Sequence, residues 1–66
     1  MSKFMSNEEI DRVIEGLRKL VDIYAVELYE LDHQRPRDLK AEYRWQHRVD
    51  KTKEVIEELK KYKNLN

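Results

Sequence analysis

The sequence contains no cysteine, one glycine and one proline, and it has no net charge, because 14 Lys and Arg residues balance 14 Asp and Glu residues. Without cysteine, the chain can form neither a disulfide framework nor a thiolate metal site. A single glycine, Gly16, excludes a glycine-rich phosphate-binding loop. No run approaches the about 18 uncharged apolar residues of a membrane span, and no apolar segment typical of a secretory signal follows the N-terminus. We therefore expect a cytoplasmic protein that does not enter a membrane.

Side chains suited to catalysis or metal binding are also scarce. The only histidines, His33 and His47, lie too far apart to form a zinc-binding pair one helical turn apart. His33 follows Glu30 by three residues, but His47 follows Arg44, whereas helical carboxylate metal sites use the Glu-x-x-His spacing on each of two helices. No serine or threonine lies near a histidine in a pattern typical of nucleophilic catalysis. The sequence predicts no enzymatic activity, no metal site and no cofactor.

What the chain does contain is a regular helical pattern, in a composition that is 42% charged and 39% apolar. Ser6 and Glu9 have the spacing of a capping box, in which each side chain accepts from the other residue's backbone N–H. Apolar residues then recur at alternating steps of four and three residues, which predicts a helix over about residues 7–32. This first seam consists of Ile10, Ile14, Leu17, Val21, Tyr24, Leu28 and Leu31.

A second helix is predicted over about residues 37–62, after a turn at 33–36. Pro36 suits the start of this helix, and Asp38 lies in its first turn or caps a helix that begins later. Asn64 is expected to form the C-terminal cap. The apolar pattern of the second helix consists of Ala41, Trp45, Val49, Thr52, Ile56 and Leu59. Two helices of equal length and a short turn predict one all-α domain, an antiparallel two-helix hairpin.

Charge favours the pairing of these two helices. Residues 7–32 contain eight acids and three bases, whereas residues 33–53 contain seven bases and three acids. An acidic helix is therefore expected to fold back on a basic one. Each exposed ion pair contributes only about 0.2–1 kcal/mol, so charge supports the pairing without driving it.

The first helix carries more apolar surface than one partner helix can cover. Projected at 100° per residue, its apolar positions span an arc of about 200°, against about 100° for a simple amphipathic helix. A chain this short also rarely builds a sufficient core alone. We therefore expect a homodimer that forms a four-helix bundle, or a higher oligomer, and we expect Gly16 to let another backbone approach. The candidate interface residues are Val13, Leu20, Ile23, Val26 and Tyr29. The alternative is that these residues are ordinary exposed side chains.

In length and layout, the predicted architecture resembles the small RNA-binding hairpins that control plasmid copy number (the Rop type). This is a likeness of form alone and implies no activity.

A basic stripe occupies one face of the predicted second helix. Its residues project within about 100° of one another, and they are Arg37, Lys40, Arg44, His47, Arg48 and Lys51. Such a stripe can bind phosphate, with a neighbouring aromatic ring stacked on a base. The first interpretation is nevertheless a solvated face paired with the acidic helix, followed by a protein-binding patch and then by a phosphate site.

These features favour a small non-enzymatic interaction protein, a regulator, adaptor or inhibitor that binds a protein partner through helical surfaces. The alternative function is an oligomer that uses the basic stripe to bind RNA, DNA or a nucleotide. A third hypothesis is mimicry of a phosphate backbone by acidic residues of the first helix, namely Glu8, Asp11, Glu15 and Asp22.

Overall fold

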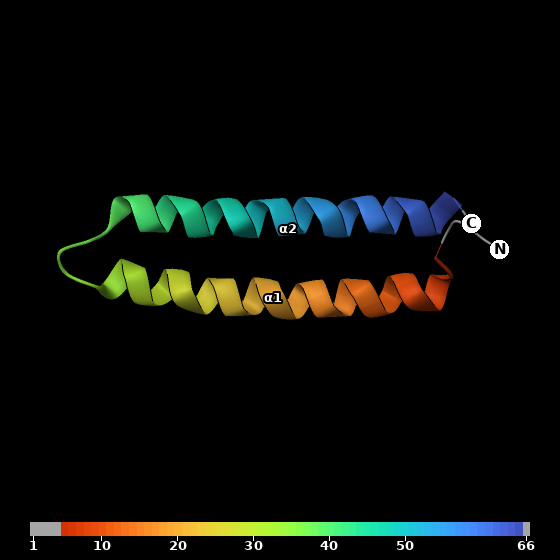
Figure 1. Cartoon of the computed structure of the whole chain (residues 1–66), viewed down its shortest axis with the longest axis horizontal. Helices are drawn as coiled ribbons and strands as arrows, with labels where there is room; N and C mark the ends of the chain where they lie inside the picture. Colours follow the sequence, from red (N-terminus) through yellow and green to blue (C-terminus); the bar gives the residue numbers. More distant parts are fainter. Residues whose placement is uncertain (1–4, 66) are drawn as a thin grey trace.

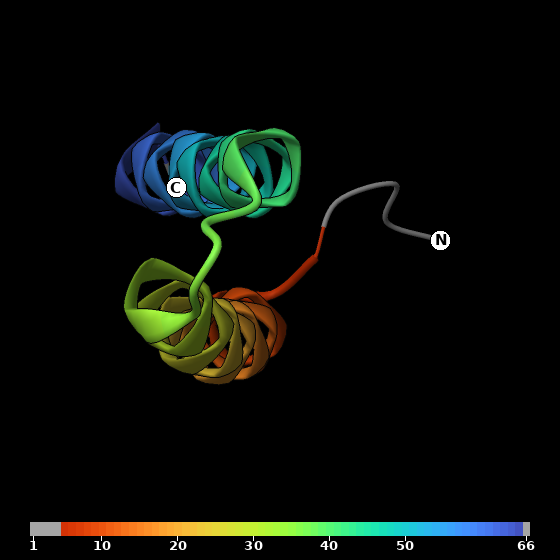
Figure 2. The same ribbon diagram turned by 90° about the vertical axis from the view of Figure 1, so that its left-hand side faces the viewer.

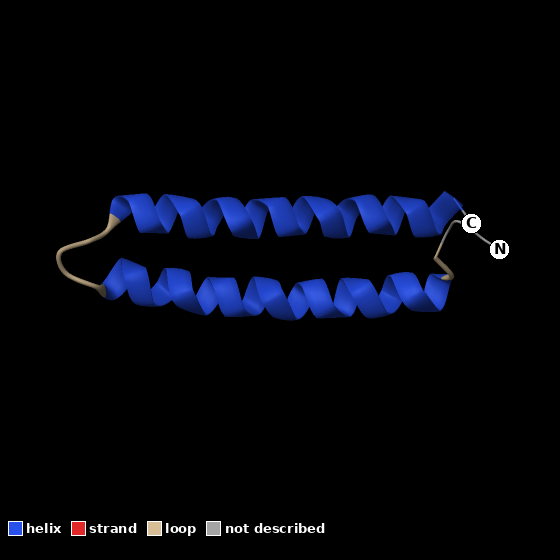
Figure 3. Ribbon diagram, viewed as in Figure 1, coloured by secondary structure: helices blue, strands red, loops and turns tan. Residues whose placement is uncertain are grey.

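A computed structural model describes residues 5–65, and the side chains of residues 5–63, as two helices joined by one turn (Figures 1 and 3). Helix α1 spans Asn7–His33 and helix α2 spans Leu39–Leu65, and each contains 27 residues. The two helices lie antiparallel, so the turn forms one end of the molecule and the other end is open (Figure 1). The predicted all-α hairpin is confirmed.

Helix α1 begins where the sequence predicts. The Glu9 backbone N–H donates to Ser6 Oγ at 3.2 Å, and the Ser6 N–H donates to Glu9 Oε1 at 3.4 Å. Both halves of the capping box are therefore present. Glu8 and Glu9 also place negative charge at the positive end of the helix dipole.

The turn lies slightly later in the chain than the predicted 33–36. His33 belongs to α1, and its Nδ1 lies 2.8 Å from the carbonyl oxygen of Tyr29, one turn earlier. Helix α2 begins at Leu39 rather than residue 37, because Asp38 Oδ1 accepts the backbone N–H of Ala41 at 3.0 Å and so caps the helix. The later of the two predicted positions for this helix start is therefore the observed one.

Three further expectations about the second helix need correction. Pro36 lies in the turn and does not open the helix, and Arg37 lies in the turn as well. Helix α2 continues to Leu65, so Asn64 is part of the helix and does not end it. The lysines near its C-terminus favour the extension, because their charge complements the negative end of the helix dipole.

The best-packed part of the core lies toward the open end. Ile10, Ile14 and Ile56 are buried there, and four half-buried residues pack against them: Leu17, Val21, Leu59 and Tyr62. Toward the turn, the helices meet through the rings of Tyr24 and Trp45, whose centroids lie 5.4 Å apart. Every residue of the first seam is buried or half-buried, so the predicted inward face of α1 is confirmed.

The hairpin is long and thin. It measures 53 × 18 × 15 Å, and its radius of gyration is 15.3 Å, against about 11 Å for a compact domain of 66 residues. Its accessible surface is 5642 Å², whereas a globular monomer of 8.2 kDa exposes about 4,500 Å². The hairpin thus exposes about 1,100 Å² more than a compact protein of its mass.

Candidate protein-interaction surfaces

Seen end-on, the molecule is a single pair of helices, and no other described helix covers either flank (Figure 2). The antiparallel arrangement and the 100° step per residue determine which side chains share a flank. One flank combines a stripe of α1 with the basic residues of α2. On α1 it carries Val13, Gly16, Leu20 and Ile23, and on α2 it carries Arg44, Arg48, Lys51 and Val55.

The stripe of α1 on this flank is a second seam, consisting of Val13, Gly16, Leu20 and Ile23. The residues follow one another at steps of three, four and three, as in a coiled-coil seam. Val13 and Leu20 are 40% and 39% exposed, and Ile23 is 57% exposed. The second seam points about 90° away from the first, so α2 covers little of it.

Gly16 has open space around it within the hairpin. A methyl group at this position would meet no atom within 4 Å, apart from its chain neighbours and the backbone of its own helix. The glycine therefore serves no contact within the single hairpin. Its place between Val13 and Leu20 makes the middle of the second seam the flattest part of α1.

The five residues predicted to form one interface lie on three different sides of α1. Val13, Leu20 and Ile23 lie together in the second seam. Val26 points away from α2 and is 57% exposed. Tyr29 turns toward the opposite flank, where its ring lies 4.2 Å from the ring of His33. The wide apolar arc expected from the sequence is thus one continuous stripe and two side chains outside it.

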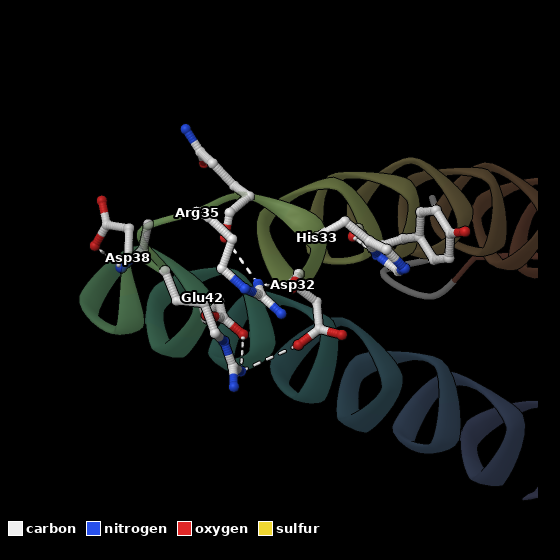
Figure 4. A network of polar contacts seen from close by, with 9 residues as sticks. Asp32, His33, Arg35, Asp38 and Glu42 are labelled. Carbon is white, nitrogen blue, oxygen red and sulfur yellow. Dashed lines mark hydrogen bonds and ion pairs between the residues drawn. The ribbon is translucent and has the colours of Figure 1, made fainter.

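Arg37 is engaged at the turn, where its guanidinium pairs with Asp32 of α1 and Glu42 of α2. Both carboxylates are labelled in Figure 4. Its guanidinium donates to both carboxylate oxygens of Glu42, at 3.1 and 2.7 Å, and lies 3.1 Å from Asp32 Oδ1. The hydrogen bond to Glu42 is the main cause that raises the pKa of Arg37, and the charges of Glu42 and Asp32 add to it. We therefore remove Arg37 from the candidate binding residues, because it fastens the turn.

Two other members of the basic stripe also have partners within α2. Lys51 Nζ lies 3.5 Å from a carboxylate oxygen of Glu54, one turn along the helix. The guanidinium of Arg48 lies 4.7 Å from the centre of the Trp45 ring, within range of a cation–π interaction. Trp45 belongs to the inward pattern predicted for the second helix, and it is half-buried in the structure. The outer face of its ring lies under the Arg48 guanidinium.

The remaining members of the stripe lie close to the turn. The side chains of Lys40 and Arg44 have no hydrogen bond or ion pair with any described residue, and the His47 ring stacks on Tyr43 with 13° between their planes. Leu39 and Tyr43 beside them are 65% and 75% exposed. We call Leu39, Lys40, Tyr43 and Arg44 the turn-end surface. The sequence had indicated an aromatic ring beside the stripe, but not Leu39, although Leu39 and Tyr43 form an apolar i,i+4 pair outside the inward pattern.

The acidic helix makes few direct ion pairs with the basic stripe. In the described part of the chain, Arg37–Asp32 is the only ion pair between the stripe and α1. Lys63 near the open end adds one further pair with Asp11, at 2.7 Å. Most other exposed lysines and arginines lie near carboxylates one turn away on their own helix, or near none among the described residues.

Residues 5–65 contain no group of three or more metal-binding side chains that could hold an ion. Neither described helix has an apolar stretch long enough to cross a membrane. No protein-family model, curated protein sequence or solved structure matches the chain.

Proposed function

We propose that the protein is a non-enzymatic interaction protein that binds a protein partner through helical surfaces, as a regulator, adaptor or inhibitor. The observation that supports this function best is the turn-end surface. Two large apolar side chains, Leu39 and Tyr43, lie there beside the positively charged side chains of Lys40 and Arg44. No other described residue of the hairpin covers this surface. Tyrosine and arginine are among the residues that contribute most to protein–protein binding.

The chemistry of this surface indicates what kind of segment it would bind. Leu39 and Tyr43 offer an apolar contact, while Lys40 and Arg44 provide two positive charges next to it. A complementary segment would present an apolar side chain flanked by carboxylates, since opposite charges around an apolar contact fix its register. The partner we propose is therefore an acidic amphipathic segment of another protein.

A photo-crosslinking amino acid in place of Tyr43 tests this proposal in extracts of the source cell. We expect one discrete protein adduct, because Tyr43 lies at the centre of the surface. The matched control carries the same probe at Glu57, an exposed position of α2 near the open end. Arg44→Glu, added to the Tyr43 probe, should abolish the adduct. Equal adducts at both probe positions, or an adduct that survives Arg44→Glu, would contradict the proposal.

A second candidate function is the binding of a phosphate-bearing ligand, such as RNA, DNA or a nucleotide. The observation that favours it is that Lys40 and Arg44 are unpaired and lie next to the Tyr43–His47 ring stack. An arginine that contacts phosphate releases counterions, so the affinity for an RNA oligonucleotide should fall steeply with salt. Arg44→Glu should remove this binding and leave the helical content unchanged. Binding that is insensitive to salt would count against this candidate.

A further inference from the structure

We propose that a second copy of this chain covers the second seam, with the two α1 helices antiparallel and Gly16 of one copy opposite Leu20 of the other. The inference rests on the proposed function, since it names one partner of the helical surfaces. It concerns α1, whereas the surface proposed for a foreign partner lies on α2.

The surface area of the hairpin fits one further protein chain of similar size. The excess of about 1,100 Å² over a globular monomer is close to the about 800 Å² that each partner buries in a standard interface. The excess follows from the thin shape of the hairpin, which leaves both flanks of α1 open. Packing two hairpins through α1 removes the α1 part of one such flank from water in each copy.

The angle between the two seams of α1 fits a four-helix arrangement. In such a bundle, each helix occupies a corner and touches two neighbours about 90° apart around its own axis. The first seam faces α2, and the second seam lies about 90° from it. Helix α1 therefore has one seam for the partner within the hairpin and one for a neighbour that the hairpin does not supply.

The second seam is complementary to itself when reversed. If two α1 helices cross antiparallel near residue 18, Val13 of one copy faces Ile23 of the other, and Gly16 faces Leu20. A small residue is then opposite a large one in the central layers, and an apolar pair lies on each side of them. One turn further out, Glu9 of one copy lies opposite Glu27 of the other at the ends of the contact. A twofold interface requires this kind of self-complementarity, because the same surface serves both copies.

The charges on the same flank decide which helix of the second copy lies against α1. On α2, this flank carries Arg44, Arg48 and Lys51, with Val55 as its exposed apolar residue. Packing the second seam on α2 of the other copy would cover these bases with Leu20 and Ile23, and burying charge against apolar side chains is costly. Packing α1 on α1 buries apolar residues against apolar residues and leaves the bases of each α2 at the edge of the contact, where their long side chains reach water.

Two variants with equal exposure test the proposal by solution mass. Wild-type protein should show twice the 8.2 kDa mass of the chain across a concentration series in light scattering. Ile23→Asp should raise the dissociation constant on the order of 100-fold, because the residue occurs twice in the interface. Val26→Asp is the control, since Val26 is also 57% exposed but lies outside the second seam, and its mass should match the wild type. A monomeric wild type, or equal dissociation by both variants, overturns the proposal.

Cysteine crosslinking tests the orientation, and the absence of native cysteine makes the readout simple. A mixture of Val13→Cys and Ile23→Cys proteins should form a mixed disulfide much faster than either variant forms a disulfide with itself. Faster self-pairing of either variant would show a different arrangement and overturn the antiparallel α1 contact. If the wild type is a monomer while the Tyr43 probe still yields its discrete adduct, the second-copy proposal fails and the proposed function stands.

Discussion

Replacing Gly16 with alanine separates what the single hairpin requires from what its assembly requires. Gly16 lies in the middle of α1, where glycine is unfavourable because it loses more backbone freedom on folding than any other residue. In the hairpin, a methyl group at this position meets no neighbouring atom within 4 Å. The substitution therefore tests the conformational preference of the chain without creating a clash inside the monomer.

The expected magnitude follows from these two facts. Alanine is favoured over glycine in a helix interior by about 0.5–1 kcal/mol, and no steric cost offsets this gain within the hairpin. We expect Gly16→Ala to raise the free energy of unfolding of dilute, monomeric protein by this amount. At concentrations where the second seam is covered, the methyl group meets Leu20 of the second copy, so the gain should shrink or reverse.

Urea unfolding followed by circular dichroism at low and high protein concentration measures both effects. Ala25→Gly is the matched control, because Ala25 is an exposed residue of the same helix outside the second seam. Its cost should be about 0.5–1 kcal/mol at every concentration. If Gly16→Ala destabilises the dilute protein, the open space around Gly16 in the hairpin is refuted. If its gain is the same at all concentrations, Gly16 does not face a second copy.

Three other substitutions test the core, the second helix start and the turn. Ile10→Ala should lower the free energy of unfolding by about 2–5 kcal/mol in urea denaturation, because Ile10 is fully buried; a loss below 1 kcal/mol would contradict its place in the core. Asp38→Ala should cost about 1 kcal/mol and reduce helicity at the start of α2, whereas unchanged melting would mean that Asp38 is not the cap. Arg37→Gln should lower the melting temperature by an amount that is constant between about pH 7 and pH 10 and that shrinks with added salt. The pKa of Arg37 is raised in the folded state, so its contribution is complete below its unfolded-state pKa and is lost only as the pH rises through the higher folded value. A contribution that falls with pH inside this range would contradict the bridge to Glu42.

The parts of the fold that were predictable are those set by local chemistry. The capping box at Ser6 depends on residues three positions apart, so the sequence determines it directly. The first seam was predictable because a regular alternation of three and four residues places every member on one side of a helix. Two such helices joined by a few residues can pack against each other only as an antiparallel hairpin.

The turn and the basic stripe were harder to predict, because they depend on which partners lie within reach in space. Pro36 and Asp38 are both good residues for a helix start, and the sequence does not rank them. In the structure, Asp38 caps α2, and this leaves Arg37 free to reach Glu42 and Asp32. A helical projection that includes Arg37 therefore overestimates how many basic residues the stripe contains. It also cannot show that the Arg48 guanidinium lies over the Trp45 ring.

The two proposed surfaces occupy parts of the hairpin that are held together in different ways. The second seam begins beside Ile14, in the best-packed part of the core, and ends just past the middle of α1. The turn end depends more on polar contacts, since Arg37 and Asp38 fasten it and Ala41 is the only buried apolar residue described near it. Exposed polar contacts give less stability than buried apolar side chains, so local opening should begin at the turn end. A second copy on the second seam would then stabilise the half that is already rigid and leave the turn-end surface free to adjust to a foreign partner.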